Sequence, residues 1–149
     1  MTIYTKNGET LLYEKESYIL RGIFMRIYNE LGPGHKESVY ANVFKQELKN
    51  ENIPFESEKQ INLRRNNELI GKLRIDFLAF GKIIVEFKAV EFLLPVAKKQ
   101  VQSYLVASEY KLAFLVNFGG NKLEIIRKVN DRAKKSVLSA SKSALSAIL

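Results

Sequence analysis

The chain has 149 residues, a formal net charge of +8 and an isoelectric point near 9.6, which predicts one domain with a polyanionic partner such as nucleic acid. It contains no Cys and a single His, which excludes disulfides, thiolate zinc sites and multi-histidine sites within one chain, whereas a carboxylate-only metal centre remains available. The chain does not open with a signal-peptide pattern, and no apolar run approaches the roughly 18 residues of a membrane helix, so we expect a cytoplasmic protein with no membrane partner.

Two amphipathic helices are expected first. Apolar residues recur every three to four positions from residue 16 to residue 31, and Gly32-Pro33-Gly34 then ends the helix, because Gly adopts left-handed conformations and Pro cannot continue the hydrogen-bond ladder. A second apolar stripe covers residues 39–48. Glu37 lies three residues before Tyr40, on nearly the same face. Its carboxylate either interacts with the helix dipole or helps to bind a metal ion.

Three antiparallel strands are predicted next, over residues 56–65, 69–79 and 83–90. Asn66-Asn67 offers turn chemistry between the first two, and Gly81 joins the second to the third in a short hairpin loop. Four basic residues near the first turn form either a solvated sheet face or phosphate contacts: Arg64, Arg65, Lys72 and Arg74.

Asp76 and Glu86 are equidistant from Gly81, so a hairpin centred on Gly81 places the two carboxylates opposite one another. Lys88 follows two residues later, on the same face. Facing carboxylates repel unless a cation lies between them, and hard divalent ions are held by one or two carboxylates with waters and phosphate oxygens. The alternative is a partly exposed strand pair in which Lys88 neutralises Glu86 and Asp76 pairs with Arg74 or Lys72.

A third helix is expected to begin at Pro95, because Pro fits the first helical turn. Gln100 and Tyr104 lie one turn apart within it, so both can approach the strands that bear the carboxylates, where they would orient substrate or a second layer of water; equally, Tyr104 is a core residue. Further strands follow at residues 112–118 and 123–129, which completes a mixed α/β order of two helices, three strands, a helix and two strands.

These motifs resemble a known family. Asp76 followed by Glu86-Phe87-Lys88 is similar to the Asp…Glu-x-Lys signature of the PD-(D/E)XK nuclease superfamily, and Gly34-x-x-Glu37-x-x-Tyr40 resembles the motif of the GxxExxY proteins. Gln100-x-x-x-Tyr104 and Leu115-Val116-Asn117-Phe118 resemble later segments of the same family. The sequence departs from the pattern at Ile75, where the superfamily name has Pro, and at Tyr28, where the family has His.

The resemblance implies a PD-(D/E)XK nuclease-like mixed β-sheet flanked by helices, within a domain over residues 1–130. It also implies hydrolysis of DNA or RNA phosphodiester bonds with Mg²⁺ or Mn²⁺. Asp76 and Glu86 would hold the ion with Glu37 assisting, and Lys88 would act on the attacking water. Tyr40, Gln100 and Tyr104 would bind substrate or lie just behind the ligands.

Two interpretations in which the protein is not an enzyme remain open. One is a nucleic-acid-binding or scaffolding module that keeps the nuclease fold but does not cut, and the other is a structural protein whose charges form surface ion pairs. Residues 131–149 form a basic tail rich in Ser and Ala, which is disordered, docks on the domain or mediates self-association into a homo-oligomer.

Overall fold

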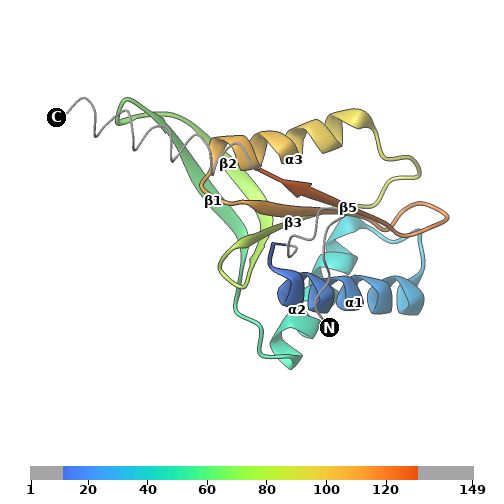
Figure 1. Ribbon diagram of the computed structural model, residues 1–149. Coiled ribbons are helices and arrows are strands. Elements are labelled where there is room, and N and C mark those ends of the chain that lie inside the picture. The colour runs from blue at the N-terminus through green and yellow to red at the C-terminus, as the bar shows by residue number, and fades with distance from the viewer. Residues whose placement is uncertain (1–11, 131–149) are drawn as a thin grey trace, which may run out of the picture. The chain divides into compact units, whose positions relative to one another are not determined.

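The computed structural model describes residues 12–130, and the predicted α/β class and order of elements are confirmed. The helices are α1 (Glu14–Leu31), α2 (Glu37–Asn50) and α3 (Pro95–Ala107) (Figure 1). The strands are β1 (Phe55–Arg65), β2 (Glu68–Ala79), β3 (Ile83–Lys88), β4 (Leu112–Asn117) and β5 (Glu124–Val129). They form one mixed sheet in the order β1-β2-β3-β4-β5, flanked by helices. No helix within residues 12–130 has the length and apolar character needed to cross a membrane.

The described residues fall into two compact units. Unit 1 contains the described residues up to Pro54 together with Phe87–Leu93 and Val116–Ile125, and unit 2 contains Phe55–Glu86, Leu94–Leu115 and the described residues from Ile126. Strands β3, β4 and β5 each contribute residues to both units. The predicted tail at 131–149 lies outside the described residues, so the predicted boundary at residue 130 stays a prediction.

The core of unit 1 is aromatic. The predicted stripes of α1 and α2 are buried, and pairs of aromatic rings join the two helices to each other, to β3 and to the residue after β4. The centroid distances are 5.5 Å for Phe24–Phe44, 5.0 Å for Phe44–Phe87, 4.9 Å for Phe87–Phe118 and 4.5 Å for Tyr40–Phe118. Each aromatic residue buries about 150–250 Å², so this cluster supplies much of the apolar burial of unit 1.

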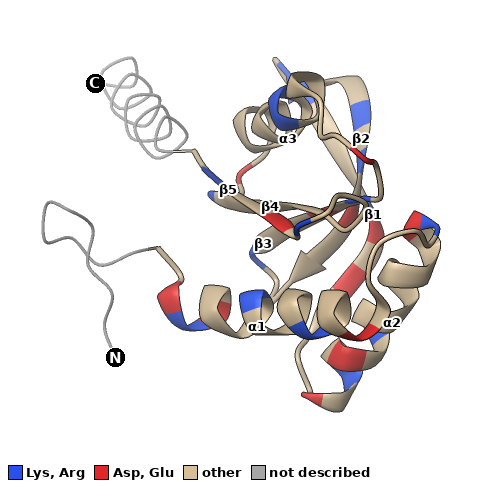
Figure 2. Ribbon diagram, turned by 90° about the vertical axis from the view of Figure 1, so that its right-hand side faces the viewer, with Lys and Arg blue, Asp and Glu red and all other residues tan. Residues whose placement is uncertain are grey.

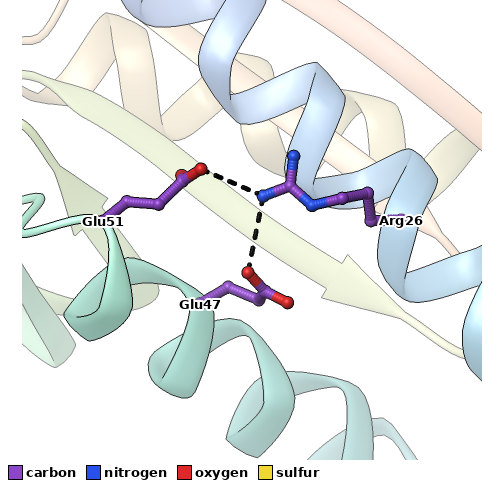
Figure 3. Close-up of polar contacts among 3 residues, drawn as sticks. All are labelled: Arg26, Glu47 and Glu51. Atoms are coloured by element: carbon purple, nitrogen blue, oxygen red, sulfur yellow. Dashed lines mark hydrogen bonds and ion pairs between the residues drawn. The ribbon is translucent and has the colours of Figure 1, made fainter.

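The same two helices are joined at their surface by Arg26 of α1, whose Nη2 lies 3.4 Å from Glu47 Oε2 and 3.1 Å from Glu51 Oε1 (Figure 3). The Arg26 side chain is 51% exposed, so solvent screens both ion pairs and each contributes at most about 1 kcal/mol. The aromatic core, rather than these charges, holds α1 against α2.

Helix α1 ends as predicted. Gly32 has a φ of 64°, which favours glycine, and its N–H donates to Tyr28 O at 2.8 Å. Helix α2 begins at Glu37, two residues before its apolar stripe, and its N-cap Lys36 makes no side-chain capping bond. A carboxylate at this first helical position is favoured by the N-terminal end of the helix dipole.

In unit 2, β1 and β2 form a long antiparallel hairpin through Asn66 and Asn67, whose φ values of 51° and 65° match the positive values of a tight two-residue turn. The β2–β3 register pairs Ala79 with Ile83 and Phe77 with Val85, which centres that hairpin on Gly81 as predicted. Helix α3 buries Ala97, Val101, Tyr104 and Leu105, which recur at helical spacing on one face.

Strand β3 ends at Lys88, two residues before its predicted end. The side chain of Asn117 takes over both backbone groups of Val90: Oδ1 accepts from Val90 N–H at 3.0 Å, and Nδ2 donates to Val90 O at 2.9 Å. The backbone at Val90 is thus held by a side chain instead of by a neighbouring strand. Apolar periodicity alone could not reveal this replacement.

Candidate active site

The site begins with Asp76 and Glu86 on neighbouring strands of unit 2. Continuing the β2–β3 register outward from the Phe77–Val85 pair brings these two residues opposite one another. The Asp76 backbone N–H donates to Glu86 Oε1 at 2.8 Å, which orients the Glu86 carboxylate across the strand pair. The hairpin geometry predicted from the sequence is confirmed at this point.

Glu86 is only 6% exposed, whereas Asp76 is half-buried. A buried carboxylate loses most of its hydration, and a charge-assisted hydrogen bond from one amide recovers part of that loss. Asp76 across the strand is a second carboxylate of the same sign, so its negative charge raises the cost further. A cation bound by both side chains would lower that cost, which makes the pair the candidate site.

The donor chemistry of the pair fits Mg²⁺ or Mn²⁺. Hard divalent ions prefer carboxylate oxygens, and Mg²⁺ is commonly held by one or two carboxylates while waters or phosphate oxygens fill its other positions. Among residues 12–130 the structure contains no group of three or more His, Cys, Asp or Glu suited to a metal ion. Asp76 and Glu86 are the two facing carboxylates that could hold such an ion together. Glu37 is exposed and belongs to unit 1, so its assistance, directly or through water, stays a prediction.

Tyr104 and Gln100 of α3 belong to the same unit as the carboxylates. Tyr104 is 7% exposed, and burial raises the pKa of its phenol, as do the negative charges of Glu86 and Asp76. A hydrogen bond with the Gln100 side chain acts in the opposite direction and lowers the pKa of Tyr104. The electrostatic influence of Glu86 and Asp76 on Tyr104 agrees with the predicted approach of this helix face to the carboxylates. A role in catalysis stays a prediction.

Lys88 is the last residue of β3. It follows Glu86 by two positions in the same strand, so the two side chains project from one face. Its side chain is partly exposed, and its carbonyl accepts from Phe118 N–H at 2.9 Å. The backbone that presents the Lys88 ammonium is thereby bonded to the residue that follows β4.

Asn117 and Gly119, to which the sequence analysis assigned no role of their own, together hold the chain just after Lys88. Asn117 is fully buried; beyond its two bonds to Val90, Oδ1 accepts from Gly119 N–H at 3.1 Å and Nδ2 donates to Glu124 Oε1 at 3.2 Å. A Cβ atom added at Gly119 would lie 2.4 Å from Val90 N. An amide within the apolar run 112–118, followed by Gly119-Gly120, was the available signal.

Tyr40 organises the turn that precedes Glu37. Its side chain is fully buried, its hydroxyl donates to Gly32 O at 2.6 Å, and it accepts from His35 N–H at 3.2 Å. The ring stacks on Phe118 with planes 7° apart. The spacing of Gly34, Glu37 and Tyr40 thus has a structural reason, because the tyrosine holds the turn from which the helix carrying Glu37 begins. The buried Tyr40 hydroxyl therefore holds the backbone of this turn in place. A role of Tyr40 in substrate binding stays a prediction.

Tyr28, which stands where the related family has His, also has a structural contact. Its hydroxyl donates to Gly120 O at 2.9 Å, within unit 1. It therefore supports the loop after β4, two residues beyond Phe118. The departure at this position removes no proposed metal ligand.

Comparison with known proteins agrees with the geometry. The family model described as "PD-(D/E)XK nuclease superfamily" matches residues 14–129. A solved structure, "Crystal structure of SSO0001", is similar over 82% of this chain and 69% of that chain, with 22% sequence identity and a TM-score of 0.45. None of the curated proteins compared with the chain matches it.

Proposed function

The chain belongs to the PD-(D/E)XK nuclease superfamily, and from this premise we propose that it is a divalent-metal-dependent nuclease that hydrolyses phosphodiester bonds. The observation that supports this most strongly is the buried Glu86 carboxylate, held by the Asp76 amide across the hairpin and close enough to Tyr104 to raise the pKa of its phenol. A charge buried at such cost is expected where chemistry requires it.

In this proposal Asp76 and Glu86 hold Mg²⁺ or Mn²⁺, and Glu37 contributes directly or through water. The bound ion would act as a Lewis acid toward phosphate oxygens and lower the pKa of a bound water. Lys88, on the face of β3 that bears Glu86, orients the attacking water and stabilises the negative charge that develops on the phosphate in the transition state. The reaction is a direct hydrolysis, so no side chain forms a covalent intermediate.

Tyr104 and Gln100 complete the proposed site. Because burial and the two carboxylates raise the pKa of Tyr104, its phenol keeps its proton through neutral pH and can donate a hydrogen bond to a water or a phosphate oxygen. Gln100 is exposed on α3 and orients the phenol through their shared hydrogen bond. Both residues therefore position groups around the carboxylates and exchange no proton with substrate.

The Gly34-x-x-Glu37-x-x-Tyr40 motif supports membership in the narrower GxxExxY group. Within this proposal Tyr40 acts as a positioning residue. Its hydrogen bond to Gly32 O sets the turn before α2, and that turn sets the place of Glu37 at the first position of the helix.

The test is cleavage of labelled single-stranded and duplex DNA and RNA, with and without Mg²⁺ or Mn²⁺, by wild type and Lys88→Ala. We expect metal-dependent cleavage by wild type. The variant should lose on the order of 10²-fold or more in single-turnover cleavage with nearly unchanged affinity, because Lys88 serves the transition state. Lys49→Ala, which removes an exposed lysine of α2, is the control and should cut normally.

Two outcomes would contradict the proposal. Absence of cleavage on all four substrates with either ion would favour a non-cleaving binding module. Unchanged cleavage by Lys88→Ala would show that the chemistry takes place elsewhere on the chain.

A further inference from the structure

The β1–β2 hairpin extends as a two-stranded ribbon whose outer part is exposed on both faces (Figure 1). All residues from Arg64 to Ile70 are exposed. Most strands of a sheet bury at least one face, so a segment exposed on both sides is not explained by the core of unit 2. The tip also exposes large apolar side chains, with Leu69 at 47% and Ile70 at 63%.

The two faces of the ribbon differ nearer the core. On β2, Leu73 and Ile75 point to the inner face, where one is half-buried and the other fully buried. On the outer face, the register pairs Arg74 with Gln60 and Lys72 with Asn62, and all four of these side chains are exposed. This outer face is therefore polar and basic over two successive cross-strand pairs.

The outer face is continuous with the proposed active site. Alternate residues of a strand share a face, so Lys72, Arg74 and Asp76 lie in one row along β2. At about 3.4 Å per residue this row spans about 14 Å. Each strand of a nucleic-acid duplex carries one phosphate per 3.4 Å of axis, so the row matches about four base-pair steps that end at the carboxylates.

The outer part of the ribbon is basic. Residues 60–74 contain four cations, Arg64, Arg65, Lys72 and Arg74, and one carboxylate, Glu68 (Figure 2). Arg74 also pairs with Glu58 at 2.8 Å, but both side chains are 65% exposed, so a phosphate can replace this partner at little cost. Among residues 12–130, Lys72 takes part in no ion pair.

The chemistry of the tip favours duplex DNA over the other nucleic acids. A two-stranded ribbon fits the B-form major groove, which is about 12 Å wide, whereas the deep and narrow major groove of A-form RNA excludes it. Asn66, Asn67 and the two arginines beside them are residue types that read adenine and guanine edges, and the exposed Leu69 and Ile70 suit contact with thymine methyl groups.

We propose that the β1–β2 ribbon is a duplex-DNA-binding arm, in which Lys72 and Arg74 hold phosphates of the strand that leads to Asp76 and Glu86 while the tip enters the major groove. This proposal rests on the nuclease function proposed above and specifies its substrate. The arm would give the enzyme most of its affinity for substrate, and the carboxylate pair would perform the chemistry.

The experiment measures binding without chemistry, by fluorescence anisotropy in the presence of a chelator. Labelled duplex DNA, duplex RNA and single-stranded DNA of one sequence are titrated with wild type, Lys72→Glu and Lys15→Glu over a range of salt concentrations. Lys15 is an exposed lysine in the first turn of α1, where a carboxylate suits the helix dipole, so the control matches the change in net charge without harming the fold.

We expect wild type to bind duplex DNA at least about tenfold more tightly than duplex RNA. Lys72→Glu should weaken duplex-DNA binding about tenfold at low salt and reduce the salt slope by about 1, while Lys15→Glu stays near wild type. Thermal melting should be unchanged in both variants, because both lysines are exposed.

An equal loss of duplex-DNA affinity in the two variants would show that binding depends on net charge and not on the ribbon, which would overturn the proposal. Tighter binding of RNA or of single-stranded DNA would overturn it as well. The two proposals fail separately. If Lys72→Glu binds duplex DNA normally and wild type cleaves with metal, the DNA-binding arm is refuted and the nuclease function stands. If Lys72→Glu binds duplex DNA more weakly but wild type cleaves no substrate, the nuclease function is refuted and the DNA-binding arm stands.

Discussion

Asn117 in unit 1 and Glu86 in unit 2 are both buried polar residues near the ends of central strands, yet the groups around their side chains differ greatly. Asn117 is fully buried, and its amide makes four hydrogen bonds, to Val90 N–H, Val90 O, Gly119 N–H and Glu124. Glu86 is 6% exposed and charged, and it faces a second carboxylate. A satisfied neutral amide costs little to bury, whereas a carboxylate beside a carboxylate costs a great deal.

The difference separates a polar residue with a structural role from one with a proposed functional role. Asn117 holds the backbone after Lys88 in place, and its hydrogen bonds account for its burial. Glu86 accepts from the Asp76 N–H, and under the proposed function a metal ion bound with Asp76 would offset its charge. Exchanging amide and carboxylate at the two positions should therefore have opposite effects on stability.

The largest effect is expected for Asn117→Asp. The new carboxylate loses both donated hydrogen bonds and lies beside Val90 O and Glu124, so the free energy of unfolding should fall by about 3 kcal/mol or more. Denaturant unfolding measures this. Asn121→Asp, at an exposed position of the following turn, is the control and should be nearly neutral. A small loss at Asn117 would mean that the amide network does not hold the loop.

Gly119→Ala should come next. Its Cβ would lie 2.4 Å from Val90 N and 2.5 Å from Ala89 C, both backbone atoms that cannot move aside singly, so we expect a loss of about 2 kcal/mol or more. Gly71→Ala is the matched control, because its nearest new contact is a Leu63 side-chain atom at an ordinary 3.7 Å. Cleavage should fall with stability, since the displaced backbone follows Lys88 directly. Equal melting temperatures for the two variants would contradict this close approach.

Glu86→Gln should act in the opposite direction on the metal-free protein. The amide oxygen can still accept from Asp76 N–H while the buried charge is removed, so the free energy of unfolding should rise by about 1 kcal/mol. Mg²⁺ or Mn²⁺ should raise the melting temperature of wild type and leave that of the variant unchanged. Lower stability of the metal-free variant would show instead that the charge is compensated within the protein.

The smallest effect concerns pH. Burial and the charges of Glu86 and Asp76 raise the pKa of Tyr104 above its ordinary value of about 10. As the pH rises through that value, the unfolded chain releases the phenol proton while the native protein keeps it. The contribution of the protonated Tyr104 phenol to the free energy of unfolding is therefore complete below about pH 10. It is lost as the pH rises through the higher pKa that Tyr104 has in the folded protein. Tyr104→Phe should show a shallower alkaline decline in stability.

A spectroscopic titration sharpens the same point. Binding of Mg²⁺ at Asp76 and Glu86 would neutralise the charges that raise the pKa of Tyr104, so the tyrosinate absorbance of this residue should appear at lower pH with metal than without it. The difference between wild type and Tyr104→Phe isolates the signal from the other tyrosines. An identical titration with and without metal would place the ion away from the carboxylates.

Much of the fold, together with the facing carboxylates of the candidate site, was determined by local features of the sequence. The apolar stripes of α1 and α2, the turn at Asn66-Asn67 and the hairpin centred on Gly81 depend on residues close together in the chain, where periodicity and turn chemistry act. The pairing of Asp76 with Glu86 follows from the same symmetry about Gly81, because a hairpin register is set by its turn.

Only the tertiary structure decided the rest, because those features join residues far apart in the chain. β3 ends at Lys88 because Asn117, 27 residues beyond Val90, takes over its backbone groups. Tyr40 is a buried support of the Gly32 turn because Phe118 stacks on its ring. The shift in the pKa of Tyr104 likewise depends on burial and on charges from other elements. Periodicity reports which face of an element is apolar, but it does not report which distant group will meet that face.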